Sequence, residues 1–133
     1  MPDNPSHRQF ELSPERYAAM INWPKRLAFE EPFYRALFAS VGVQRVLDVA
    51  CGTGHHAQMF HSWGLDVEAA DASPEMLAYA RHTHGVGQRL NWVQRSFTEP
   101  PTSGPFDAAI CVGNSLALAA ALAGVQHVPT TML

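Results

Sequence analysis

The sequence predicts an α/β protein in which helices flank an open, mainly parallel β-sheet. Two observations predict this fold. Beyond residue 43, short apolar runs alternate with segments of about ten residues that have helical character. A pair of glycines follows the first apolar run, and an aspartate ends the second. With 133 residues, of which 47% are hydrophobic and 16% charged, the chain has the size and composition of one globular domain.

The first 42 residues are expected to precede the sheet. Residues 1–12 are polar and are interpreted as a flexible tail. Residues 13–42 are interpreted as an N-terminal helical cap. Ser13 followed by Pro14 is typical of a helix start, because the serine side chain caps free amides and proline at the first position loses no hydrogen bond.

Further prolines are expected to divide this cap. The first helix should break near Trp23 and Pro24, because a residue before proline disfavours the helical conformation. A second helix should begin at Glu31-Pro32 and close at Gly42, which can adopt a left-handed conformation.

Four strands and three helices are expected in the rest of the chain. The strands should occupy residues 45–50, 66–70, 90–94 and 106–112, and the helices residues 55–63, 74–84 and 115–127. This alternation predicts right-handed crossovers between parallel strands. A ligand should bind at the carboxyl ends of these strands, where the distinctive polar residues lie.

Composition excludes several classes of function. Nine Lys and Arg against 12 Asp and Glu give a net charge of −3 without a basic cluster, which argues against binding to nucleic acid or to a membrane surface. The N-terminus lacks a secretory signal, so a cytoplasmic location is expected. The uncharged residues 108–125 are rich in Ala and Gly and fit a buried strand followed by a helix better than a membrane span.

Histidines and cysteines show no metal-ligand spacing, so no metal site is expected. The seven histidines are interpreted as surface or helix-end residues. Cys51 and Cys111 do not form a C-x-x-C motif or a disulfide framework, which is typical of a reducing compartment.

The strongest functional signal is the segment LDVACGTGHHA. Gly52 and Gly54 lie where a strand must turn into a helix, and the lack of a Cβ lets a ligand approach the backbone. This spacing also fits a dinucleotide-binding turn. Asp48 favours a different ligand, because a carboxylate would repel a pyrophosphate but would suit an ammonium or sulfonium group. The alternative is a structural turn beside a solvated aspartate.

A second candidate residue ends the second predicted strand. Asp71 could accept hydrogen bonds from both hydroxyls of an adenosine ribose. Alternatively it caps the next helix, a role that Ser73 could share. Met76 on the first turn of that helix could pack against an adenine face, or simply fill the core.

Three motifs in order carry a family resemblance. LDVACGTG, DASPEMLAYAR and FDAAICVGNSL together resemble the class I S-adenosylmethionine-dependent methyltransferases, which have a Rossmann-like fold. YAAMINWPKR ahead of the first strand, together with GNSL after the fourth, resembles the glycine/sarcosine N-methyltransferase-like branch. Residues 43–133 would then be the N-terminal part of such a methyltransferase domain.

The resemblance implies a role for each matching position. The cofactor would be S-adenosylmethionine, and its methionyl amino group would be held by the backbone near Ala50 and Gly52, with support from Asp48. Asp71 would hold the ribose, and Ala72 and Met76 would line the adenine pocket. The remaining implied cofactor-binding residues come from the N-terminal cap and from the ends of the third and fourth strands: Tyr17, Trp23, Arg26, Ser96, Phe97, Asn114 and Leu116.

Some of these roles have alternatives. Tyr17, Trp23 and Arg26 would fold over the cofactor, or they would belong to an amphipathic helix packed on the sheet. Many relatives carry Gly-Asp where this chain has Arg95-Ser96. Here the Ser96 hydroxyl and the Phe97 amide would contact adenine instead, without the ionic contribution.

The chain is also shorter than the family domain, with only about four of the usual seven strands. The fourth strand would become an exposed apolar edge, which indicates either a truncated product or a homodimer or partner chain that covers this edge.

The predicted activity is in-line transfer of a methyl group to a small-molecule acceptor, by analogy an amine. Such chemistry needs alignment and a desolvated pocket, and the sequence names no catalytic base. The alternatives are a cofactor-binding but inactive fragment or module that needs a partner chain and, less favoured, an NAD-binding dehydrogenase half-domain.

Overall fold

A computed structural model describes residues 13–96, 98–101, 103–113 and 116–125. The predicted flexible tail, residues 1–12, lies outside this part of the chain. The helices are α2 (Pro14–Ala19), α3 (Trp23–Val41), α4 (His55–Ser62) and α5 (Pro74–His84). The strands are β1 (Arg45–Asp48), β2 (Asp66–Asp71), β3 (Leu90–Gln94), β4 (Phe106–Gly113) and β5 (Leu116–Val125).

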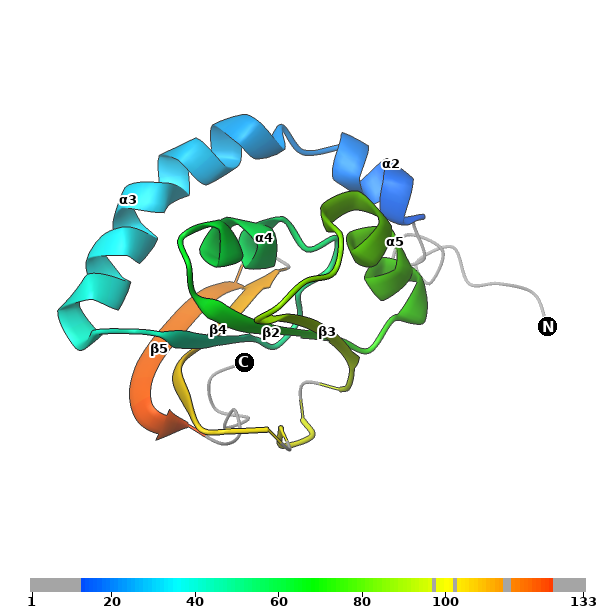
Figure 1. The fold of residues 1–133 in the computed structure, drawn as a ribbon. Coiled ribbons are helices and arrows are strands. Elements are labelled where there is room, and N and C mark those ends of the chain that lie inside the picture. The colour runs from blue at the N-terminus through cyan, green and yellow to red at the C-terminus, as the bar shows by residue number, and fades with distance from the viewer. Residues whose placement is uncertain (1–12, 97, 102, 114–115, 126–133) are drawn as a thin grey trace.

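The strands form one sheet in the order β3-β2-β1-β4-β5 (Figure 1). β1 lies in the middle and runs parallel to β2 and β4, and β3 runs parallel to β2. Only β5 is antiparallel to its neighbour. The four parallel strands with flanking helices confirm the predicted Rossmann-like α/β fold.

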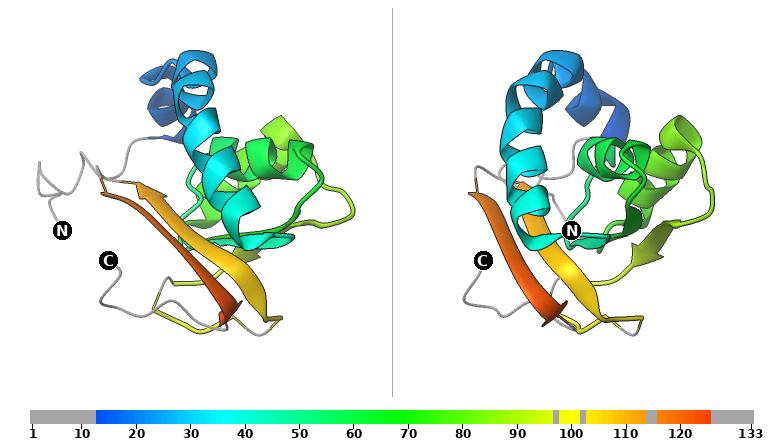
Figure 2. Two further views of the ribbon diagram at one scale, coloured as in Figure 1. Left: turned by 90° about the vertical axis from the view of Figure 1, so that its left-hand side faces the viewer. Right: turned by 60° about the vertical axis from the view of Figure 1, so that its left-hand side comes forward.

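Helices α3, α4 and α5 lie on one side of the sheet, and the main core lies between them (Figure 2). Phe60 of α4 is fully buried and packs edge-on against Tyr34 and Phe38 of α3, with ring centroids 5.2 and 5.1 Å apart. A smaller cluster that includes Leu47 and Phe106 forms separately. The core therefore fixes α3 beside α4 and packs α4 against β2 and β3.

A loop follows β3 and is tied to the sheet by a buried ion pair. Arg95 donates from Nη2 to Glu68 Oε2 at 2.7 Å, and the Ser103 hydroxyl also bonds to Glu68. At the start of β1, the amides of Gln44 and Arg45 each donate to Asp107 at 2.9 Å. The two bonds to Asp107 link β4 to the start of β1, although the two strands are distant in the sequence.

The N-terminal helices differ from the prediction in one respect. Ser13 caps α2 and Gly42 closes α3 in a left-handed conformation, as expected. However, α3 begins at Trp23 and continues through Pro32, so the predicted second start at Pro32 is wrong. Asn22 caps α3, which makes Pro24 a first-turn residue, where proline loses no hydrogen bond.

Burial explains why proline does not interrupt α3. Pro32 is exposed, whereas Tyr34 and Phe38, which follow it in the same helix, are buried in the core. Packing of this inner face outweighs the loss of one hydrogen bond at the outer face.

The segment after β4 also differs from the prediction. A helix was expected over residues 115–127, but residues 116–125 form β5, paired antiparallel to β4. An alanine-rich run has no strong hydrophobic period, and the unpaired backbone of the apolar β4 offers it a ladder of hydrogen bonds. The expectation that the β4 edge is exposed is therefore wrong, whereas the homodimer or partner chain stays a prediction.

Candidate functional site

The glycine turn lies at the carboxyl end of the sheet, between β1 and α4. Gly52 and Gly54 have φ angles of 56° and 85°. A Cβ on Gly52 would meet nothing within 4 Å, whereas a Cβ on Gly54 would lie 2.7 Å from the ring of Trp92 and 2.9 Å from Ala80. The space beside Gly52 fits the approach of a ligand. Gly54 has a packing role that the sequence analysis missed, because it lets α4 start against α5 and β3.

Asp71 connects the end of β2 to this turn. Its Oδ2 accepts a hydrogen bond from the amide of Gly52 at 2.8 Å, and its Oδ1 accepts one from the amide of Ser73 at 2.9 Å. The Ser73 hydroxyl accepts from the amide of Met76 at 3.2 Å and caps α5. Ser73 is therefore the N-cap residue of α5, and Asp71 takes part only by accepting from the amide of Ser73. A carboxylate oxygen can accept two hydrogen bonds, so Asp71 retains capacity for a ligand.

Asp48 ends β1 as a buried carboxyl group. Its side chain is 1% exposed, so the alternative of a solvated aspartate is wrong. Burial raises the pKa of Asp48 to about 7, and the charge of Asp71 adds to this effect, while a hydrogen bond from the Ala50 backbone opposes it. Its Oδ1 has no hydrogen-bond partner. A bound cation would satisfy this oxygen, which is otherwise costly to bury.

The N-terminal residues named from the sequence lie on two helices. Tyr17 is half-buried on α2, a helix that contacts α5. Trp23 begins α3 and stacks on His55, with ring centroids 4.2 Å apart and planes 4° from parallel. Arg26 lies over Trp23 at 5.2 Å and donates to Glu30 at 2.9 Å. Trp23 and Arg26 thus lie beside the start of α4, next to the glycine turn.

Trp23 also carries an unpaired polar group. Its indole Nε1 is buried without a hydrogen-bond partner. Among the side chains that the structure describes, only this donor and the Asp48 Oδ1 acceptor are buried and unpaired. Most buried polar groups in proteins are paired, so two exceptions near one turn indicate a place where a ligand supplies the partners.

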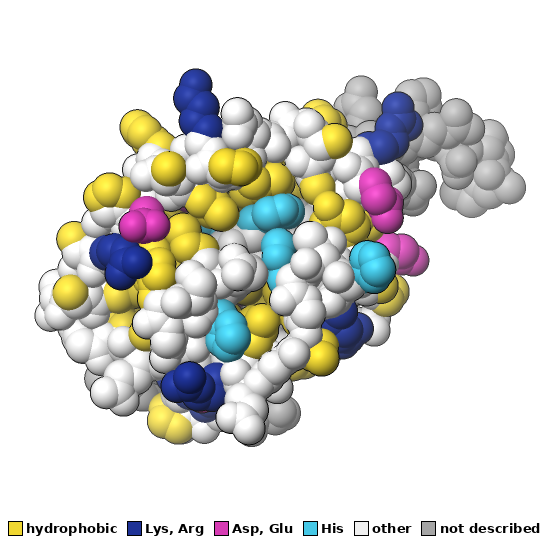
Figure 3. All heavy atoms as spheres, turned by 45° about the horizontal axis from the view of Figure 1, so that its top comes forward, with side chains coloured by type: hydrophobic (Ala, Val, Ile, Leu, Met, Phe, Trp, Pro, Cys, Tyr) yellow, Lys and Arg dark blue, Asp and Glu magenta, His cyan; other side chains and the backbone are white. Residues whose placement is uncertain are grey.

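Histidines gather around the glycine turn, on the helical side of the molecule (Figure 3). His55 and His84 stand at helix ends, as expected, but His56 is only 5% exposed, so its interpretation as a surface residue is wrong. His56 Nε2 lies 2.7 Å from Glu30 Oε1. Burial lowers the pKa of His56, and its bond to Glu30 opposes this effect. The sequence signal for this cluster is the pair of adjacent histidines after the glycine turn. Adjacent helix positions face different directions, so His55 and His56 contact different neighbours.

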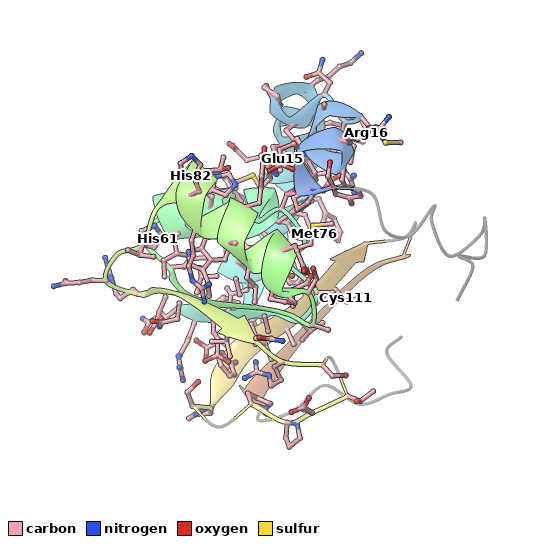
Figure 4. All side chains as sticks on the ribbon, turned by 90° about the vertical axis from the view of Figure 1, so that its right-hand side faces the viewer. Glu15, Arg16, His61, Met76, His82 and Cys111 are labelled. Atoms are coloured by element: carbon pink, nitrogen blue, oxygen red, sulfur yellow. The ribbon has the colours of Figure 1, made fainter. Side chains whose placement is uncertain are left out.

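Small and apolar residues follow the strand ends. Ala50 is half-buried and precedes the glycine turn, and Ala72 is exposed beside Asp71. Met76 lies half-buried in the first turn of α5. Figure 4 shows it on the side of α5 that faces α2. The ends of β1, β2 and β4 thus converge with the first turn of α5, as the sequence predicted.

The segment after β3 uses its polar groups within the protein. Arg95 forms the buried pair with Glu68, and both side chains are less than a tenth exposed. The Ser96 amide donates to Glu99 Oε1 at 3.1 Å, and the Ser96 hydroxyl lies 3.0 Å from that of Thr98. The expected contact between Ser96 and adenine stays a prediction, and it would compete with these bonds.

The side chains of three remaining predicted site residues are not described by the structure. Phe97 and Asn114 lie outside the described residues, and the side chain of Leu116 does too. The backbone of Leu116 begins β5 instead of the predicted helix.

Cysteine pairing and metal binding are the other candidate chemistries in the described part of the chain. Cys51 packs against the main core, whereas Cys111 packs against the smaller cluster, so the two thiols do not face each other. No group of three His, Cys, Asp or Glu side chains among these residues could hold a metal ion. Within the same residues, no helix is long and apolar enough to cross a membrane.

Comparisons with known proteins agree with this geometry. A family model described as a methyltransferase domain matches residues 46–128. A glycine/sarcosine N-methyltransferase from Parasynechococcus marenigrum (strain WH8102) is 40% identical over 104 residues, which cover 76% of this chain and 37% of that protein. Human glycine N-methyltransferase is 39% identical over 104 residues, covering 69% of this chain and 35% of that protein. The chain thus spans little more than a third of the length of these relatives.

Solved structures support the fold. An S-adenosylmethionine-dependent methyltransferase from Mesorhizobium loti is 30% identical with a TM-score of 0.52, covering 62% of this chain and 38% of that one. A TehB-like methyltransferase from Corynebacterium glutamicum has a TM-score of 0.56 at 24% identity, covering 83% of this chain and 56% of that one.

Proposed function

Because the chain belongs to the class I methyltransferases, whose cofactor is S-adenosylmethionine, we propose that it transfers a methyl group from this cofactor to a small-molecule amine. One observation carries the proposal. Asp48 presents a buried, unpaired carboxylate oxygen close to the glycine turn. A cationic ligand satisfies such an oxygen, whereas the pyrophosphate of a dinucleotide would be repelled by it.

The groups around the turn fit the cofactor in charge and in space. The cofactor carries an ammonium, a carboxylate, a sulfonium, a ribose and an adenine. Asp48 and the backbone at Ala50 and Gly52 would hold the ammonium end, where Gly52 leaves open space. Asp71 would accept from the ribose hydroxyls while it keeps its bond to the Gly52 amide. Ala72 and Met76 would line the adenine.

The first turns of α3 would close the other side of the cofactor. Trp23 offers an unpaired indole N–H as a donor. Arg26 holds Glu30 through its Nε, so the two Nη groups of its guanidinium are oriented as a fork suited to a carboxylate. Tyr17 on α2 would complete this cover, and Ser96, Phe97, Asn114 and Leu116 would lie near the adenine and the sulfonium.

When bound, the cofactor supplies an electrophilic methyl group on a sulfonium sulfur. The chain's own part is to orient the reactants and exclude water, and the burial of Asp48 and Thr53 shows that the turn is already shielded from solvent at these residues. The acceptor is proposed to be a glycine-like amine in its unprotonated form, which the names of the similar N-methyltransferases support.

Calorimetry tests the cofactor site. The wild-type chain is expected to bind S-adenosylmethionine and S-adenosylhomocysteine but not NAD. Asp71→Ala should weaken binding by at least tenfold, since it removes charged hydrogen bonds to both the ligand and the Gly52 amide. Asp66→Ala, at the opposite end of the same strand, is the matched control and should bind like the wild type. NAD binding, or equal affinity in both variants, would contradict the proposed site.

A second experiment tests the transfer. The chain is incubated with methyl-labelled cofactor and either glycine or sarcosine, and the labelled product is measured. Product with either amine supports the proposed activity. Binding without product would support the alternative of a cofactor-binding segment that does not turn over alone.

A further inference from the structure

Three structural elements meet on one imidazole ring. His55 is the first residue of α4. Trp23 of α3 stacks on one side of its ring at 4.2 Å, and His84 of α5 approaches edge-on with ring centroids 4.8 Å apart. His55 Nδ1 also lies 3.0 Å from the hydroxyl oxygen of Thr53 in the glycine turn. The ring therefore joins α3, α5 and the turn.

Thr53 is held at both of its polar ends. The residue is 1% exposed and lies between the two turn glycines. Its hydroxyl bonds to His55, and its carbonyl oxygen accepts from His84 Nε2 at 3.0 Å. Because a carbonyl only accepts, His84 must carry a proton on Nε2. Thr53, which lies between Gly52 and Gly54, is thus held in place by hydrogen bonds to His55 and His84.

We propose that His55 is a positioning residue that fixes Thr53, and through it the glycine turn, in the conformation that receives the cofactor. The inference rests on the proposed function, since it names a residue that prepares the same site. In this role the hydrogen bond between the ring and the Thr53 hydroxyl sets the turn, and the stack with Trp23 docks the start of α3. A purely packing role for the ring would need only the stack.

Two substitutions separate the hydrogen bond from the stack. His55→Asn keeps a polar atom near the position of Nδ1 but removes the aromatic ring. His55→Phe keeps the ring beneath Trp23 but removes the bond to Thr53. His82→Asn and His82→Phe on the exposed side of α5 are matched controls. All variants are measured in the full 133-residue chain.

Three readouts are taken on each variant. Calorimetry gives the Kd for S-adenosylhomocysteine, and thermal unfolding gives the Tm. Amide hydrogen exchange in the ligand-free chain follows Gly54, whose N–H donates to the Cys51 carbonyl at 2.9 Å across the turn. The exchange rate reports the turn whether or not the chain binds the cofactor.

His55→Phe is expected to weaken binding about fivefold and to speed Gly54 exchange about fivefold, the effect of losing one hydrogen bond, and to lower the Tm because the buried Thr53 hydroxyl loses its partner. His55→Asn should show Gly54 exchange within about twofold of the wild type, although the lost stack lowers its Tm and, because Trp23 also contributes to the cofactor site, weakens binding.

Wild-type exchange in His55→Phe, or an increase in Gly54 exchange in His55→Asn as large as that in His55→Phe, would overturn the proposal. If the wild-type chain does not bind the cofactor, the proposed function fails. The exchange rate in His55→Phe then decides the positioning role by itself, because an unchanged rate overturns it.

Discussion

Asp48 is a buried residue whose side chain can ionise. The pKa of this carboxyl is raised by burial to about 7, against an ordinary value of 3.8. The folded state therefore keeps a proton that the unfolded state releases between about pH 4 and pH 7. Its contribution to stability is complete below pH 4 and is lost as the pH rises through 7. The residue that suits a cationic ligand thus reduces the stability of the ligand-free protein at neutral pH.

Asp48→Asn should therefore separate stability from binding. At pH 8 the variant is expected to have a higher free energy of unfolding, on the order of 1–2 kcal/mol, because asparagine cannot ionise. The gain should vanish below pH 4, and affinity for S-adenosylmethionine should fall. Urea unfolding at both pH values and calorimetry check this, with Asp66→Asn as the control. A variant less stable than the wild type at pH 8 would contradict the argument.

Gly54→Ala tests packing beneath the turn. The new methyl group would lie 2.7 Å from the Trp92 ring at a position with φ 85°, so we expect a loss of about 3 kcal/mol in unfolding free energy. Gly64→Ala has nearly the same φ, 86°, but meets nothing within 4 Å and should cost about 1 kcal/mol. Equal losses in the two variants, measured by urea unfolding, would show that backbone conformation alone makes Gly54 necessary.

Individual site residues differed in how well the sequence predicted them. The position of Asp71 at a strand end could be predicted, because parallel strands bring their carboxyl ends to one edge. The partners of Thr53 could not, because they come from helices whose packing is decided by tertiary contacts. Glu30 and His56, which lie 26 positions apart, are a second pair of this kind.

At the scale of elements, α3 shows that local sequence preferences alone do not determine where a helix begins and ends. In the sequence, both prolines of this helix indicate a helix boundary. In the structure, Pro24 lies in the first turn and Pro32 lies in the interior. The burial of Tyr34 and Phe38 carries the helix past Pro32. In the same way, the open edge of β4 draws the alanine-rich segment 116–125 into a strand. Elements with strong periodicity and clear ends, such as α5, could be predicted from the sequence alone.

The two prolines make a matched pair of substitutions. Pro32→Ala should raise the free energy of unfolding by roughly 1–2 kcal/mol, since alanine restores an interior hydrogen bond of α3. Pro24→Ala should change it by less than about 0.5 kcal/mol, because a first-turn amide has no intrahelical partner. Chemical denaturation measures both. If Pro32→Ala destabilised the chain, α3 would depend on the proline for its geometry.

At the scale of the whole molecule, the histidine cluster joins the helices to the sheet in a pH-sensitive way. Burial lowers the pKa of His55 to about 4, with the nearby His84 and His56 adding to the effect. Burial also lowers the pKa values of His56 and His84. Because these folded-state values lie below the ordinary 6.5, the stability that the cluster contributes is present above pH 6.5 and is lost as the pH falls toward 4.

His55→Asn should accordingly flatten the pH dependence of stability. Between pH 7.5 and pH 5 the wild type should lose about 1 kcal/mol more unfolding free energy than the variant, a figure reduced for the partial exposure of the ring. Thermal unfolding across this range measures the difference, and His82→Asn should follow the wild type. Parallel pH profiles for wild type and His55→Asn would mean that position 55 does not titrate differently on folding.

The central place of β1 in the sheet has a consequence for the order of folding. Residues 45–94 form β1, α4, β2, α5 and β3 through local crossovers, whereas β4 returns to β1 through contacts such as that of Asp107 with Arg45, 62 positions away. Closing so long a loop costs chain entropy before any contact repays it, and high contact order slows folding. The half of the sheet that carries Asp71 should therefore form first, and arrival of β4 should limit the rate at which Asp48 becomes buried.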